Sequence, residues 1–228
     1  MKRRFIVLIT ICTAFPLFQK DVHAVDRVVV NSIQTDRWYE NVYLMADRIN
    51  WMTFRNFTVQ IGDRDGSLFH FPTWESGKYD TYLFREDLNN DKFKDIIIVL
   101  DSYQDPIHVL QHDGSSDYKE VTVEPAAVAV KRLVKMEKKG DIVTIATKQK
   151  VYNINVKPFH YTTVKPSSTD VSIDGDQVDY SVEENKIVAD VPVFITIGGL
   201  IGDLKLSYDW TGNGYEVTSV SFKRYIPK

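Results

Sequence analysis

Residues 87–100 read DLNNDKFKDIIIVL, a polar loop that runs directly into an apolar segment. The apolar run IIIVL, residues 96–100, is rich in β-branched side chains, which favour strands. A strand at a protein surface alternates apolar and polar residues, whereas this run is apolar at every position. It therefore predicts a central β-strand that is buried on both faces.

The chain on either side of this strand alternates with a period of two, which is typical of half-buried strands. In NFTVQI, residues 56–61, Phe57, Val59 and Ile61 point one way and the polar residues point the other. The turn DRDG and the segment LFHF complete a predicted hairpin. Similar strand pairs follow at 107–110 with 119–123, 141–146 with 150–156, 177–182 with 186–191, and 203–210 with 215–222. We therefore expect a mostly β protein made of antiparallel sheets.

One segment breaks the period of two. EPAAVAVKRLVK, residues 124–135, begins with an acid and a proline, which favours a helix start. Ala126, Val130, Leu133 and Val134 would share one face of that helix. The pattern predicts one amphipathic helix that packs on a sheet.

This helix and the charged segment MEKKGD, residues 136–141, favour an internal boundary. We expect a first β lobe of residues 25–136, ending in the helix. A second antiparallel lobe of residues 137–228 would form a β-sandwich or meander. One continuous domain with the helix docked across it is the alternative.

Residues 1–24 have the features of a secretory signal peptide. The basic MKRR precedes an apolar run, residues 5–18, that is too short to span a bilayer. Val22 and Ala24 fit the small-residue pattern before a cleavage point, so cleavage is expected after Ala24. A retained membrane anchor is one alternative, and a lipoprotein attached at Cys12 is another. Export predicts a protein that is secreted or associated with the cell envelope.

Cleavage would change the composition of the chain. The full sequence has 28 basic and 31 acidic side chains, and the signal peptide holds Lys2, Arg3, Arg4, Lys20 and one acid, Asp21. The mature chain would keep 24 basic and 30 acidic side chains, a net charge of −6. An acidic protein is a poor match for nucleic acid. The single cysteine also leaves with the signal peptide, so the mature chain would form no disulfide.

The loop before the buried strand has the spacing of a calcium site. Asp87, Asn89, Asp91 and Asp95 stand at its positions one, three, five and nine, and Phe93 would add its backbone carbonyl from position seven. Calcium takes six to eight oxygen ligands, and alternate oxygen side chains can curl around one ion. We predict calcium binding here, with a Kd on the order of 10⁻⁴–10⁻³ M, as in extracellular modules. A polar surface turn is the alternative.

The pattern D-x-N-x-D-x-x-x-D, followed by an aliphatic strand, resembles the calcium loop of FG-GAP or VCBS-type repeats of bacterial secreted proteins. The resemblance covers roughly residues 40–125. It implies a propeller-blade type of sheet, with calcium held by Asp87, Asn89, Asp91 and Asp95. Lys92 stands where the family usually has glycine. One repeat cannot close a propeller, which needs about four to eight blades, so a compact lobe built on one such sheet is expected.

Other residue patterns are less specific. His108 and His112 lie four apart on a predicted strand, but no third metal ligand is fixed by spacing, which favours ordinary strand histidines. The chain has no H-E-x-x-H, no G-x-S-x-G and no glycine-rich phosphate loop. If exposed, the aromatic residues Trp38, Tyr39, Trp51 and Trp74 could stack on sugar rings, and core or edge packing is the alternative.

These patterns favour a secreted, non-catalytic β protein with a structural calcium ion and an extracellular or envelope partner that the sequence does not identify. The alternative is a secreted hydrolase that acts on a cell-wall or polysaccharide substrate.

Overall fold

The computed structural model describes residues 26–76, 81–100, 102, 106–115, 117–159, 171–175, 177–195 and 199–226. The predicted signal peptide lies outside these residues. Strands predominate in the described part of the chain, and one α-helix, α1 (Ala126–Leu133), accompanies them, as expected. The elements of the first half are β1 (Asp26–Ile33), the short 3-10 helix η1 (Trp38–Glu40), β2 (Val42–Arg48), β3 (Phe54–Ile61), β4 (Ser67–Ser76), β5 (Tyr82–Glu86), β6 (Asp95–Val99), β7 (Ile107–His112) and β8 (Tyr118–Val123). Those after the helix are β9 (Lys135–Lys139), β10 (Ile142–Ala146), β11 (Val151–Asn155), β12 (Ser172–Ile173), β13 (Asp179–Glu183), β14 (Lys186–Phe194), β15 (Leu200–Trp210) and β16 (Gly214–Arg224).

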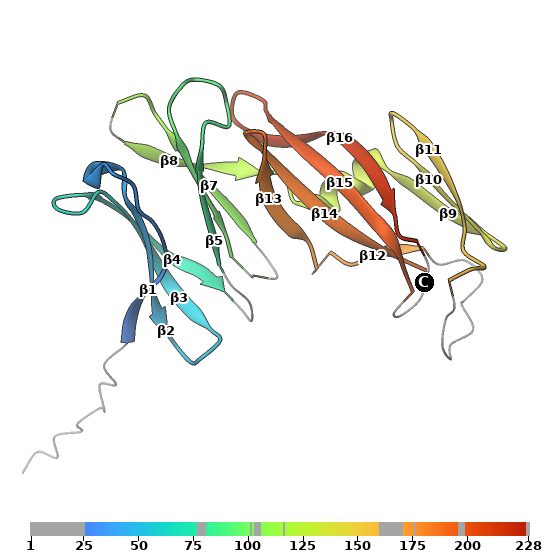
Figure 1. The fold of residues 1–228 in the computed structure, drawn as a ribbon, viewed down its shortest axis with the longest axis horizontal. Helices are drawn as coiled ribbons and strands as arrows, with labels where there is room; N and C mark the ends of the chain where they lie inside the picture. Colours follow the sequence, from blue (N-terminus) through green and yellow to red (C-terminus); the bar gives the residue numbers. More distant parts are fainter. Residues whose placement is uncertain are drawn as a thin grey trace, which may run out of the picture.

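The strands form three sheets (Figure 1). A four-stranded sheet has the order β1-β2-β3-β4, and a three-stranded sheet has the order β11-β10-β9. Between them lies a nine-stranded sheet with the order β12-β14-β15-β16-β8-β7-β6-β5, in which β13 also pairs with β14. Neighbouring strands are antiparallel, as predicted, except for the parallel pair β16 and β8.

Strand β6 is buried along its whole length, which confirms the predicted central strand. Its side chains alternate between two hydrophobic cores. Ile96 and Ile98 belong to a core shared with β2 and β3, whereas Ile97 and Val99 belong to a larger core built on α1, β10 and β14–β16. The strand therefore forms part of the packing on both sides of its sheet.

The predicted hairpins are present. Pairing joins β3 to β4, β7 to β8, β10 to β11, β13 to β14, and β15 to β16. The helix is shorter than the predicted span of 124–135, because Pro125 is extended at its start and Lys135 already begins β9. Its buried residues, Ala126, Ala129 and Val130, face the larger core, so the helix packs on the sheet as expected.

The nine-stranded sheet contains strands from both sides of residue 136. Thr122 and Val123 of β8 pair with Gly214 and Tyr215 of β16. A Cβ atom at Gly214 would lie 2.4 Å from the Thr122 hydroxyl oxygen, so this approach of the two backbones requires glycine. The two predicted lobes thus share one sheet, and the boundary at 136–137 stays a prediction.

Shared packing on β6 predicts the effect of core substitutions. Ile97→Ala and Ile98→Ala should each lower the free energy of unfolding by about 2–5 kcal/mol, because each leaves a cavity in a different, fully buried core. Urea unfolding followed by tryptophan fluorescence measures both. Val128→Ala, on the exposed face of α1, is the control and should change stability by less than about 0.5 kcal/mol. A loss below about 1 kcal/mol for either isoleucine variant would contradict this packing.

Candidate functional site

The predicted calcium loop connects β5 to β6, and its oxygen side chains turn toward the loop backbone. The Asp87 carboxylate accepts the N–H groups of Asp91 at 3.1 Å and Lys92 at 2.9 Å. Asn89 Oδ1 accepts the Asp91 N–H at 3.1 Å, and Asp91 Oδ1 accepts the Phe93 N–H at 2.8 Å. The loop is thus curled around the oxygen-bearing side chains at its positions one, three and five.

Asp95, at position nine, is the first residue of β6 and is fully buried. Its carboxylate accepts the Leu88 N–H at 3.2 Å and the His112 N–H at 3.1 Å. Burial raises the pKa of Asp95 to about 6; the two N–H groups oppose this rise, and the charges of Asp91 and Asp87 add to it. The Asp95 carboxylate is therefore influenced by the negative charges of Asp91 and Asp87.

The described residues contain no group of three or more His, Cys, Asp or Glu side chains arranged to hold a metal ion. In this structure Asp87 and Asp91 bond to the loop backbone, and Asp95 bonds to Leu88 and His112. Phe93, predicted to contribute its carbonyl, stacks its ring on His112 with the centroids 4.8 Å apart. Calcium coordination by these five residues stays a prediction.

The backbone of the loop turns sharply without glycine. Asn90 and Lys92 have φ angles of 61° and 75°, in the left-handed region. Asparagine tolerates this region, whereas lysine enters it at a cost of roughly 1–2 kcal/mol. Lys92 therefore adopts a conformation that glycine would adopt freely.

A groove of about 780 Å³ lies beside the loop. Lys92, Phe93 and Lys94 of the loop line it, together with η1 and the turn between β3 and β4. The charged residues of this basic groove are five cations and two acids: Arg37, Arg64, Arg85, Lys92, Lys94, Glu40 and Asp65. Two predicted aromatic residues, Trp38 and Tyr39, also line it and are more than half exposed.

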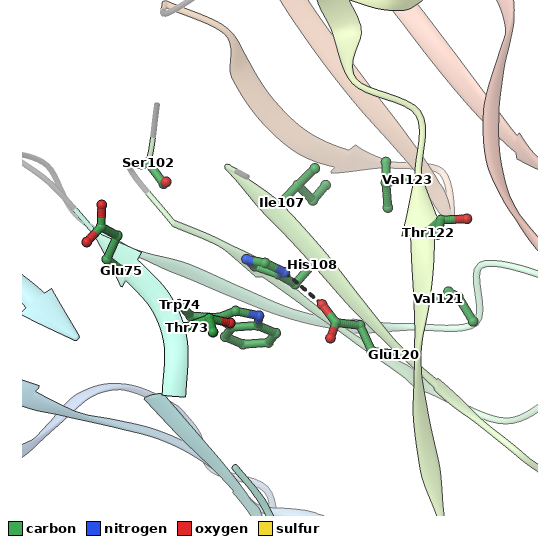
Figure 2. A pocket seen from close by; sticks show the side chains of 10 residues that line it. All are labelled: Thr73, Trp74, Glu75, Ser102, Ile107, His108, Glu120, Val121, Thr122 and Val123. Atoms are coloured by element: carbon green, nitrogen blue, oxygen red, sulfur yellow. Dashed lines mark hydrogen bonds and ion pairs between the residues drawn. The ribbon is translucent and has the colours of Figure 1, made fainter. Parts of the chain in front are cut away.

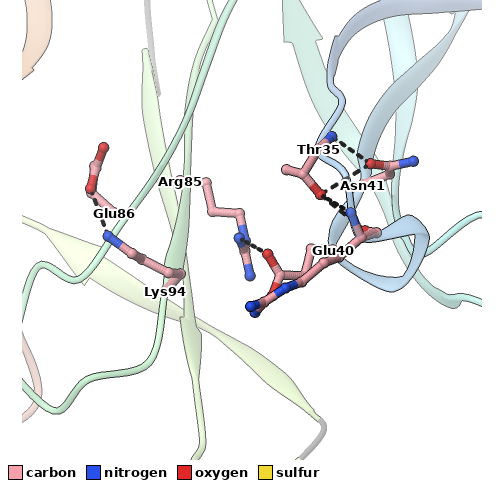
Figure 3. Close-up of polar contacts among 7 residues, drawn as sticks. Thr35, Glu40, Asn41, Arg85, Glu86 and Lys94 are labelled. Atoms are coloured by element: carbon pink, nitrogen blue, oxygen red, sulfur yellow. Dashed lines mark hydrogen bonds and ion pairs between the residues drawn. The ribbon is translucent and has the colours of Figure 1, made fainter.

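Ion pairs hold part of the groove in place (Figure 3). Glu40 accepts hydrogen bonds from Arg37 at 3.1 Å and from Arg85 at 2.9 Å. Burial opposes ionisation of Glu40, but the two arginines outweigh it and hold its pKa below the usual value. Lys94 pairs with Glu86 at 2.9 Å. Glu40 thus fixes η1 against β5. Sequence patterns missed this network, because Glu40 and Arg85 lie 45 residues apart.

The histidine pair does not act together. His108 bonds to Glu120, and His112 stacks on Phe93.

Within the described part of the chain, no helix has the length and apolar character needed to cross a bilayer. Comparison of the chain with protein-family models, curated proteins and solved structures finds no match. The resemblance to FG-GAP and VCBS repeats therefore stays a prediction.

The influence of the Asp91 charge on Asp95 predicts that removing this charge changes the pKa of Asp95. Asp91→Asn should lower the pKa of the Asp95 carboxyl below its value of about 6, because it removes a neighbouring negative charge and keeps an oxygen acceptor. Carboxyl ¹³C NMR titration in calcium-free buffer measures this pKa. Asp141→Asn, in the exposed turn before β10, is the matched control and should leave it unchanged. An unchanged or raised pKa in Asp91→Asn would show that the two carboxylates do not interact.

Proposed function

We propose that the chain is an exported, non-catalytic β protein that binds calcium at residues 87–95 and acts outside the cell or at its envelope. One observation carries this proposal: the buried carboxylate of Asp95 is bonded to two backbone N–H groups and lies beside two further carboxylates. A buried charge is costly unless a counter-charge or a metal neutralises it. A calcium ion on the oxygens of Asp87, Asn89, Asp91 and Asp95 would supply that neutralisation.

Calcium bound at this loop would also order the loop residues that line the basic groove. Phe93 is itself a predicted ligand, and Lys92 and Lys94 flank it, so an ion that orders the loop would order these groove residues as well. The groove carries more cations than acids, whereas the whole chain has a net charge of −3. We assign the partner surface to this groove, and an acidic polysaccharide fits it. Cations would meet its carboxylates, and Trp38 and Tyr39 would stack on its rings.

Calcium should stabilise the protein. At about 10 mM calcium, roughly ten to a hundred times the expected Kd, binding linkage predicts about 1.4–2.7 kcal/mol. The melting temperature of the purified protein should therefore rise by roughly 3–10 °C. Differential scanning calorimetry measures this shift, and magnesium at the same concentration should give a smaller one, because it demands a tighter octahedral site.

The double variant Asp87→Asn, Asp91→Asn should lose the calcium shift, since it removes two ligand charges and keeps two oxygen acceptors. Asp141→Asn removes one charge elsewhere and should keep the shift. Equal shifts in the wild type and the double variant would exclude this loop as the calcium site.

The variant Lys92→Gly tests both the backbone strain in the loop and the positive charge of the groove. Glycine relieves the left-handed strain, so the variant should gain about 1 kcal/mol of stability. It also removes a groove cation, so binding of an acidic polysaccharide such as polygalacturonate should weaken about two- to fivefold at low salt. Calorimetry and affinity electrophoresis measure the two effects.

Lys148→Ala, an exposed lysine in the turn between β10 and β11, is the control and should change neither quantity by as much. Unchanged polysaccharide binding in Lys92→Gly would remove this lysine from the partner surface. Release of reducing ends from the polysaccharide would favour the hydrolase alternative.

A further inference from the structure

Strand β8 changes partner along its length, and a cavity lies where it does so. The last pair of β7 with β8 is Val109 with Val121, and Thr122 and Val123 then pair with β16. Ile107 and His108, at the start of β7, are left without a partner in β8. A cavity of about 610 Å³ occupies this separation and is closed on another side by Thr73, Trp74 and Glu75 of β4 (Figure 2).

His108 is the buried polar side chain in this cavity. Its side chain is 7% exposed, and its Nδ1 lies 2.9 Å from Glu120 Oε1. The Trp74 ring stacks on the imidazole with the centroids 3.8 Å apart, and Phe71 stacks on the other face of Trp74. The imidazole is thus held in one orientation by a ring stack and an ion-pair partner.

The second ring nitrogen, Nε2, is buried and has no hydrogen-bond partner among the described residues. In Figure 2 it lies on the side of the ring away from Glu120, facing the part of the cavity lined by Ser102 and Glu75. Buried polar atoms in folded proteins are almost always hydrogen-bonded. Nε2 is therefore a binding group for which the described residues supply no partner.

The chemistry of the lining restricts what can bind there. A carboxylate accepts hydrogen bonds, so Glu120 places the proton of the neutral imidazole on Nδ1 and leaves a lone pair on Nε2. The other charged side chain of the lining is Glu75, which pairs with Arg55 at 3.1 Å. No lysine or arginine lines the described cavity, so an anion would meet repulsion from Glu120. The volume lies within the range of small-molecule sites.

We propose that this cavity binds a small ligand, neutral or cationic, that donates an O–H or N–H to His108 Nε2. Glu120 acts as the positioning residue, and the hydroxyls of Thr73 and Thr122 offer further polar contacts on the lining. The site shares no residue with the calcium loop or the basic groove. It is therefore a second binding function, independent of the proposed one.

Imidazole ¹⁵N NMR on the purified protein at mildly alkaline pH tests the proposal, because the ¹⁵N shifts report which ring nitrogen carries the proton. The probes are glucose as a neutral polyol, ethylammonium as a cation, and acetate as an anion. Glucose, ethylammonium or both should shift the His108 Nε2 resonance saturably, with a Kd on the order of 1 mM. A saturable response to glucose indicates a hydroxyl donor, and a saturable response to ethylammonium indicates an ammonium donor. No saturable shift with either, or a shift with acetate alone, would overturn the proposal.

Variants separate binding from folding. His108→Phe keeps a ring against Trp74 and removes Nε2, so it should weaken binding of the responding probe at least about tenfold. His112→Phe, on the same strand, is the matched control and should bind as the wild type does. Glu120→Ala removes the acceptor at Nδ1, so the proton should be shared more evenly between the two ring nitrogens, which the ¹⁵N shifts report directly. Equal probe binding by folded His108→Phe would contradict the assignment. Because the wild-type readout is at Nε2 itself, it does not depend on any variant folding.

Discussion

The complete burial of β6 is the constraint on which the rest of the structure depends. Its side chains alternate between two cores: the four-stranded sheet contributes to one, and α1, β10 and β14–β16 contribute to the other. The first residue of the same strand is Asp95, whose carboxylate is buried at the point where the loop meets the core. The strand thus places a hydrogen-bonded carboxylate beside two hydrophobic cores and near the negative charges of Asp87 and Asp91. The proposed calcium ion would offset these charges.

The three candidate binding features surround β6 and its neighbour β7. The calcium loop precedes β6, and the basic groove shares Lys92–Lys94 with that loop. The His108 cavity lies at the opposite end of β7, where His108 pairs with Ile98 of β6. The central strand and β7 therefore carry candidate binding side chains near both of their ends. Sites built on strands are held more precisely than sites built on loops.

Sequence periodicity predicted the parts of the fold that depend on neighbours in the chain. The run at 96–100, the hairpins and the helix are local patterns, and the structure has them. The parallel pair of β8 and β16 was missed, because it joins residues about ninety positions apart and its signal is one glycine, Gly214, that also suits a turn. The charged pattern at residues 136–141 indicates a boundary, whereas the structure has strand β9 there, with Met136 partly buried against the larger core. The His108–Glu120 pair depends on strand register, which spacing alone does not reveal.

Native-state hydrogen exchange of the β6 amides tests the central claim most directly. If calcium neutralises Asp95 at the head of this strand, the ion should slow exchange of the amides of residues 87–99 more than that of β10 and β11, which lie at the far end of the molecule (Figure 1). The predicted result is increased protection concentrated in the loop and β6 at millimolar calcium. Equal protection of the loop and β6 with and without calcium would contradict the account.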